Sequence, residues 1–148
     1  MKFYFAYGSN MDEEQMRQRG LVVKGKFPGV LHGWHLAFNK VAGSRNAGYA
    51  NIEHYSGADV QGIIYETDDS SIRKLDKYEG YPSHYHREKV TVHDRAGHDI
   101  RCTVYVANQE MTEQNLAPAK SYLRHLLSGS HCLSKEYIDF LSHVSTVS

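Results

Sequence analysis

The 148-residue sequence has few cysteines, few prolines and no surplus of charge of either sign. Its two cysteines, Cys102 and Cys132, lie far apart and without metal-binding spacing, so we expect two free thiols in a cytoplasmic protein rather than a disulfide. The 17 basic and 17 acidic residues cancel, and a neutral chain lacks the long-range attraction that draws a protein to nucleic acid or to a membrane surface. No apolar run approaches the length of a membrane span, and the apolar start at residues 1–7 is too short for a signal peptide. We therefore expect neither a nucleic-acid partner nor a membrane partner.

The residues that are present indicate an ordinary globular protein. Hydrophobic residues make up 41% of the chain and charged residues 23%, and the three prolines mark no linker, repeat or low-complexity stretch. This length favours a single domain over residues 1–148. Eleven tyrosines suggest half-wet pockets, in which a ring packs while its hydroxyl finds a polar partner.

The pattern of apolar residues and chain breakers predicts a mixed α+β protein. Strands are expected at residues 2–7, in two or three short pieces within 21–41, and at 49–55, 60–66, 85–93 and 100–107. Helices are expected at residues 11–19, within 67–80, at 117–128, and from Ser134 onward, with a flexible loop at 43–48. Because strands and helices do not alternate one for one, we expect a barrel-like mixed sheet rather than a doubly wound parallel fold.

The first predicted strand ends in a bare Gly-Ser-Asn corner. Gly8 permits a ligand to approach the backbone closely, and Ser9 and Asn10 are residue types that cap helices. The N–H groups of this corner and of the following helical turn would form a small anion site. The acidic residues 12–14 would repel a dianion but tolerate one carboxylate. A capped helix without any ligand is the alternative.

One acidic residue lies where the helix pattern predicts an apolar one. Ile72 and Leu75 define the apolar stripe of the helix within 67–80, and Glu79 falls within roughly 40° of both, whereas Asp76 sits at the edge and can reach water. Burial and the carbonyls of the last helical turn would both raise the pKa of Glu79 toward neutrality, as a general base or acid requires. Alternatively, the side chain bends into solvent or pairs with one of three basic residues: Arg73, Lys77 or Arg87.

Three segments together resemble the γ-glutamyl cyclotransferases. They are YFAYGSNM at residues 4–11, LDKYEGYPSHYHREKVTV at 75–92 and CTVYVAN at 102–108, in matching order and spacing. The resemblance covers nearly the whole chain and implies a small closed mixed β-barrel flanked by helices. It also implies conversion of a γ-glutamyl amide to 5-oxoproline with release of the amine or amino acid. No metal or cofactor is implied.

The resemblance also assigns residues. Glu79 matches the catalytic glutamate of the family, residues 4–9 match the loop that holds substrate through backbone N–H groups, and two later tyrosines match residues that line the pocket. The predicted substrate-binding residues are Tyr7, Gly8, Ser9, Asn10, Tyr85 and Tyr105. Tyr105 lies on the strand face opposite Cys102 and Val104, so its hydroxyl is expected to reach a polar pocket. Whether the corner amides hold the substrate carboxylate or the oxyanion stays open. The partner is a small γ-glutamyl compound, and a homodimer is possible because some relatives pair.

The sequence leaves open the leaving group, a non-catalytic function and a metal site. The segment 81–84 differs among relatives with different leaving groups, so γ-glutamyl amino acids, γ-glutamyl-lysine amines and larger acylated products all remain candidate substrates. A non-catalytic small-molecule-binding protein of the same fold is one alternative function. A metal site is another, built from His54, His84 and His86, the last two of which share one strand face.

Overall fold

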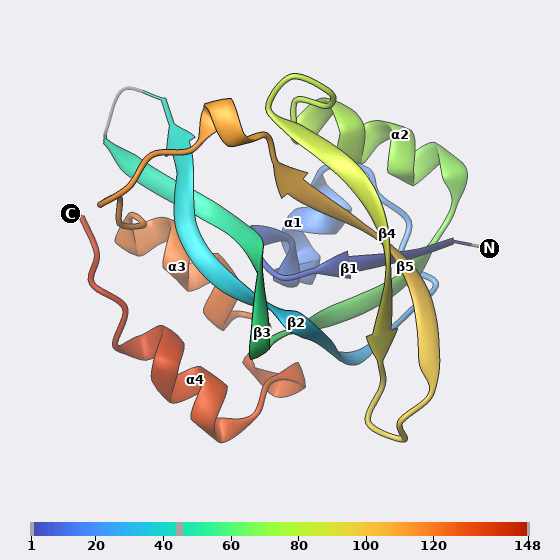
Figure 1. Ribbon diagram of the computed structural model, residues 1–148. Helices are drawn as coiled ribbons and strands as arrows, with labels where there is room; N and C mark the ends of the chain where they lie inside the picture. Colours follow the sequence, from blue (N-terminus) through green and yellow to red (C-terminus); the bar gives the residue numbers. More distant parts are fainter. Residues whose placement is uncertain (1, 44–45, 148) are drawn as a thin grey trace.

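Five strands form a closed barrel in the computed structural model, which describes residues 2–43 and 46–147 (Figure 1). The strands are β1 (Lys2–Ala6), β2 (Gly25–Ala42), β3 (Ala47–Thr67), β4 (Tyr85–His93) and β5 (Asp99–Ala107). Their order around the barrel is β1-β3-β2-β4-β5. Most neighbours pair antiparallel, and a parallel pairing of β1 with β5 completes the circle. The closed mixed β-barrel expected from the sequence is confirmed.

The strands β2 and β3 are longer than the sequence predicts, at 18 and 21 residues. The glycines that suggested breaks lie within continuous strands. At Gly29 a Cβ would lie 2.7 Å from atoms of Ile64 and 2.8 Å from Val92, so only glycine lets β2 pass this close to the core. Gly33, with φ +83°, marks an irregularity in the pairing of β2 with β3. Such irregularities curve long strands around a barrel. The predicted loop at 43–48 is shorter than expected because β3 begins at Ala47, and residues 44 and 45 lie outside the described part of the chain.

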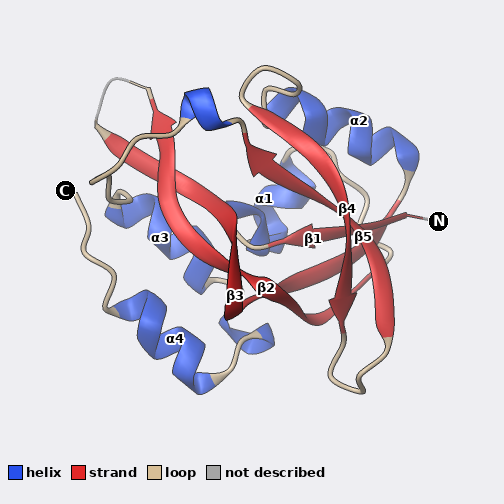
Figure 2. Ribbon diagram, in the orientation of Figure 1, coloured by secondary structure: helices blue, strands red, loops and turns tan. Residues whose placement is uncertain are grey.

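In the described part of the chain, four α-helices and three short 3₁₀ turns flank the barrel. The helices are α1 (Glu13–Gln18), α2 (Asp69–Tyr78), α3 (Lys120–Leu127) and α4 (Lys135–Ser142), and the turns are Ser9–Met11, Gln109–Met111 and Ser130–Cys132. Figure 2 shows α2 at the upper right and α3 and α4 at the lower left. Side-chain N-caps begin α2 and α4: Asp68 accepts the N–H of Ser71 at 2.8 Å, and Ser134 accepts that of Tyr137 at 3.1 Å. Within the described ranges, none of the helices has the length and hydrophobicity needed to cross a bilayer.

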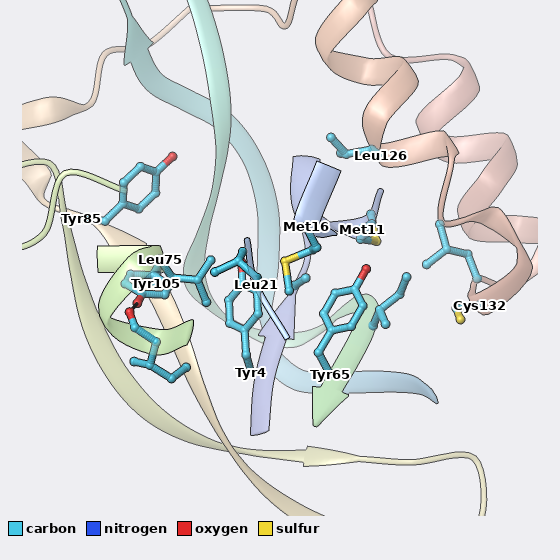
Figure 3. Packing of buried hydrophobic residues seen from close by; sticks show 14 of the residues in the cluster. Tyr4, Met11, Met16, Leu21, Tyr65, Leu75, Tyr85, Tyr105, Leu126 and Cys132 are labelled. Carbon is cyan, nitrogen blue, oxygen red and sulfur yellow. Dashed lines mark hydrogen bonds between the residues drawn. The ribbon is translucent and has the colours of Figure 1, made fainter. Parts of the chain in front are cut away.

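The buried residues form two clusters that divide by strand face. Alternate residues of one strand point to opposite faces, so Phe5 lies with the strand residues of one cluster, while Tyr4 packs with the helices in the other. Figure 3 shows part of the second cluster, in which Tyr4, Leu75 and Tyr105 gather beside α2. The helices therefore cover one face of the strands, and the end of α2 is fixed against β1 and β5. Both cysteines are buried and free, as predicted.

Candidate active site

A cavity of about 660 Å³ opens where the end of β1, the end of α2 and the start of α3 meet. It brings together all seven residues that the sequence analysis selects, which come from four separate parts of the chain. These residues are Tyr7, Gly8, Ser9, Asn10, Glu79, Tyr85 and Tyr105. Their roles toward a ligand stay predictions, but their meeting around one cavity makes a shared site physically feasible.

Glu79 follows α2 as its C-cap residue and turns its side chain to the cavity. Its N–H donates to the Leu75 carbonyl at 2.8 Å, and Gly80, at φ +65°, then redirects the chain. No residue in the ranges 2–43 and 46–147 forms a hydrogen bond or salt bridge with its carboxylate, and Arg87 pairs with Asp76 instead. Burial raises the pKa of Glu79 to about 7, although two nearby cations oppose this rise. The group is therefore poised to accept and return a proton near neutral pH.

The corner before α1 is a 3₁₀ turn, and the helix begins later than predicted. The carbonyl of Gly8 accepts the N–H of Met11 at 3.0 Å, and that of Ser9 accepts the N–H of Asp12 at 3.1 Å. A carboxylate oxygen of Asp12 then accepts the amides of residues 14 and 15 at 3.1 and 3.4 Å. The expectation that the first helical turn offers its N–H groups to an anion is therefore wrong, because Asp12 already caps it. Gly8, Ser9 and Asn10 of the corner line the cavity.

Asn10 holds this corner in place with its side chain. Its Nδ2 donates to the hydroxyl of Tyr4 at 3.1 Å, while its Oδ1 accepts from Gln15 Nε2 and Arg19 Nη1, each at 3.2 Å. The side chain is buried and its hydrogen bonds are all within the protein. Asn10 therefore fixes the corner and also fixes Arg19, whose guanidinium lies 4.6 Å from the centre of the Tyr78 ring.

The predicted tyrosines line the cavity with rings rather than with free hydroxyls. Tyr7 donates to the carbonyl oxygen of Tyr105 at 2.6 Å, and Tyr85 donates to that of Ala50 at 2.9 Å. Tyr105 lines the cavity, and its hydroxyl donates to Asp76 Oδ1 at 2.7 Å. Asp76 therefore points toward the barrel rather than into water. The rings form apolar walls whose orientation is fixed by these hydrogen bonds.

Two residues that the sequence analysis missed contribute to the cavity. Lys40 is 5% exposed, and its Nζ donates to the Val41 carbonyl at 2.8 Å. The alternating series Trp34, Leu36, Phe38, Lys40 could have found it, since a lysine occupies the next place on an apolar strand face. Arg19 also lines the cavity, and no pattern in the sequence distinguishes it from the nearby Arg17.

Tyr122, on α3, is the third missed residue. Its hydroxyl accepts the N–H of Ala50 at 2.9 Å and lies 3.2 Å from the position that a Cβ on Gly8 would occupy. The helix thus closes the cavity directly over the corner. Nearby, His125 Nδ1 is 2.8 Å from Asp12 Oδ2, so this rim histidine also contacts the cap of α1.

The histidines proposed as a metal site serve separate parts of the structure. His86 engages both ring nitrogens, with Asn108 Oδ1 and Glu88 Oε2, each at 2.8 Å. The ring of His54 packs on Trp34 with 3.7 Å between ring centroids, while His84 lines the cavity. Across the described ranges, no three His, Cys, Asp or Glu residues are grouped so as to hold a metal ion.

Comparisons with known proteins agree with this architecture. The family model described as "Gamma-glutamyl cyclotransferase, AIG2-like" matches residues 4–124. A gamma-glutamylcyclotransferase of Bos taurus is 29% identical over 132 residues, and the match covers 86% of this chain and 69% of the relative. A gamma-glutamylcyclotransferase of Mus musculus is 29% identical over 149 residues, and that match covers 95% of this chain and 77% of the relative. A solved structure described as a gamma-glutamyl cyclotransferase superposes with a TM-score of 0.85 at 24% identity, over 99% of this chain and 89% of that one. This structural likeness shows a common fold.

Proposed function

The chain belongs to the gamma-glutamyl cyclotransferase, AIG2-like family, and on that premise we propose that it converts a γ-glutamyl amide into 5-oxoproline and releases the amine, with Glu79 as the proton carrier. The observation that carries the proposal is the carboxylate of Glu79. It faces the cavity, engages none of the described side chains, and has a pKa of about 7. A desolvated carboxylate without a structural partner costs stability, which is typical of a group retained for its chemistry.

The reaction is an intramolecular transfer of an acyl group, in which Glu79 acts first as base and then as acid. The Glu79 carboxylate takes a proton from the neutral α-amino group of the substrate as that nitrogen attacks the γ-carbonyl carbon. The resulting tetrahedral intermediate carries its negative charge on the former carbonyl oxygen. The bond from this carbon to the amide nitrogen breaks as Glu79 returns the proton to that nitrogen. Atoms balance without water, and no electrons are exchanged.

The cavity supports this chemistry chiefly by positioning. Closure of a five-membered ring is intramolecular, so holding the substrate in a bent conformation supplies much of the rate gain. The rings of Tyr7, Tyr85 and Tyr105 provide rigid walls, because each hydroxyl is tied to the protein. We assign the role of donors to a substrate oxygen to the backbone amides of the Gly8–Asn10 corner, which lines the cavity.

The proposal is tested by incubating the purified chain with γ-glutamyl-alanine and measuring 5-oxoproline and alanine by mass spectrometry. We expect the two products in equal amounts, and we expect Glu79→Gln to lower kcat by about 10²–10⁴-fold while the protein stays folded. The matched control is Asp69→Asn, the same carboxylate-to-amide change in the exposed first turn of α2, which should leave kcat unchanged.

Two outcomes would contradict the proposal. Normal turnover by Glu79→Gln would remove this residue from the mechanism. Binding without product, across a panel of γ-glutamyl amino acids, γ-glutamyl-lysine amines and larger acylated compounds, would favour the non-catalytic alternative. The same panel identifies the leaving group, since His84 and Lys77 on the cavity rim lie where different amines would contact the protein.

A further inference from the structure

Lys40 is a buried cation that the reaction described above does not use. It lies near the end of β2 with 5% of its surface exposed, and it is the one charged residue among those that are buried in the described ranges. Its side chain lines the same cavity as Glu79. A buried charge is costly unless an opposite charge or hydrogen bonds compensate it.

The surroundings of Lys40 Nζ compensate the charge only in part. The ammonium donates to the Val41 carbonyl at 2.8 Å and lies 5.8 and 5.7 Å from the ring centres of Tyr49 and Tyr85. No carboxylate in the ranges 2–43 and 46–147 lies within salt-bridge distance of it. An ammonium group has three donors, so at least one stays available to a ligand in the cavity. Burial lowers the pKa of Lys40, while the negative charge of Glu79 raises it.

Building on the proposed function, we infer that Lys40 binds the α-carboxylate of the γ-glutamyl group. This carboxylate is the anionic group that every γ-glutamyl amide carries, whatever amine it releases. Arg19 is the rival cation on the cavity wall, but its guanidinium already donates to Asn10 Oδ1 and lies over the Tyr78 ring. Lys40 is more deeply buried and less engaged, so it would gain more from a carboxylate partner.

Placing the α-carboxylate at Lys40 also determines which protein groups contact the α-amine and the γ-carbonyl of the substrate. The α-carboxylate and the α-amine are bonded to the same carbon, so a carboxylate held by Lys40 brings the amine toward Glu79. The amides of the corner then remain for the γ-carbonyl oxygen, on which negative charge develops during the reaction. Lys40 thereby contacts the α-carboxylate, and Glu79 contacts the α-amine bonded to the same carbon.

The test compares two substrates that differ only in this carboxylate. They are γ-glutamyl-alanine and 4-aminobutyryl-alanine, which would give 5-oxoproline and 2-pyrrolidinone with the same leaving group. We expect Lys40→Met to lower kcat/KM for γ-glutamyl-alanine by about 10²-fold, mainly through KM, as for loss of one partner of a buried charge pair. For 4-aminobutyryl-alanine we expect less than about a threefold change. Lys74→Met is the matched control, because Lys74 also donates to a backbone carbonyl, that of Gly20 at 2.9 Å, but lies on the exposed face of α2.

Equilibrium binding gives the same comparison without turnover. By calorimetry, the unaltered protein should bind 5-oxoproline more tightly than 2-pyrrolidinone, Lys40→Met should lose this preference, and Lys40→Arg should keep most of it. Thermal melting verifies folding, and Lys40→Gln replaces Lys40→Met if the latter does not fold. The assignment is overturned if Lys40→Met still binds 5-oxoproline more tightly than 2-pyrrolidinone. It is also overturned if the variant loses affinity equally for both compounds. The proposed function has a separate test: it is overturned if the unaltered protein makes no 5-oxoproline from any of the γ-glutamyl compounds.

Discussion

The hydroxyl of Tyr105 donates to Oδ1 of Asp76 at 2.7 Å, which joins β5 to α2. The other carboxylate oxygen of Asp76 lies 3.4 Å from Arg87 Nη1 on β4. Both contacts hold the helix against the barrel three residues before Glu79. The position of the proposed proton carrier therefore depends on polar contacts outside the cavity centre as well as on the apolar packing of Leu75.

Replacing Tyr105 with phenylalanine should loosen this attachment. Tyr105→Phe keeps the ring but leaves one oxygen of Asp76 without its donor, so we expect the free energy of unfolding to fall by about 1–3 kcal/mol. Because the end of α2 would shift, kcat should also fall. Urea denaturation and steady-state rates measure the two effects, and Tyr55→Phe, at a residue that is 61% exposed, is the control. Unchanged stability would show that the hydroxyl contact contributes nothing.

The raised pKa of Glu79 predicts a dependence of stability on pH. The pKa is about 7 in the folded protein and 4.5 for an ordinary glutamate, so between these values the folded state binds more protons than the unfolded state. The favourable contribution of the protonated carboxyl is fully present below pH 4.5 and is lost as the pH rises to about 7. The total loss is on the order of 3 kcal/mol.

Glu79→Gln isolates this effect, because the amide does not titrate. We expect the variant to gain stability relative to the unaltered protein as the pH rises from 4.5 to 7, and to hold that gain above pH 7. Urea denaturation at a series of pH values measures the difference. A difference that is the same at pH 5 and pH 8 would show that the carboxyl titrates normally.

Metal chelation should leave the rate unchanged. Both ring nitrogens of His86 are within hydrogen-bond distance of protein oxygens, and His54 packs on Trp34 rather than joining His84 at the cavity. Dialysis against EDTA followed by assay with γ-glutamyl-alanine tests this expectation. Loss of activity that zinc or another divalent ion restores would favour a histidine site.

The closed barrel and most of its elements could be predicted from the sequence, but the lengths of β2 and β3 could not. Glycine and proline normally interrupt a strand, and only the neighbours show when they do not. At Gly29 the side chains of Ile64 and Val92 require the glycine inside a continuous strand, and both residues are distant in sequence. The 3₁₀ turn before α1 was missed because Asp12, rather than Ser9 or Asn10, caps the helix.

The candidate site was predictable where a residue broke a periodic pattern. Glu79 interrupts the apolar stripe of α2, and Lys40 interrupts the apolar alternation of β2 in the same way. The pattern around Lys40 is hidden in the sequence because the glycines of β2 are typical of breaks between short strands. Tyr122 carries no such signal, since a tyrosine on the buried side of a helix fits ordinary packing and only the folded chain places its hydroxyl over the corner.

The close packing at Gly8 gives a prediction for the corner itself. A Cβ at this position would lie 3.2 Å from both the Ala50 Cβ and the Tyr122 hydroxyl oxygen. Gly8→Ala must therefore shift the Tyr122 hydroxyl, the Ala50 methyl group or the corner by a few tenths of an ångström. We expect a loss of about 1–3 kcal/mol in unfolding free energy and a fall of at least about tenfold in kcat/KM. Gly25→Ala is the control, because there the nearest atom, Glu66 Cβ, is 3.9 Å away. Full activity in Gly8→Ala would show that the site tolerates movement of the corner. That result would contradict the proposal that the corner amides are fixed donors to the substrate.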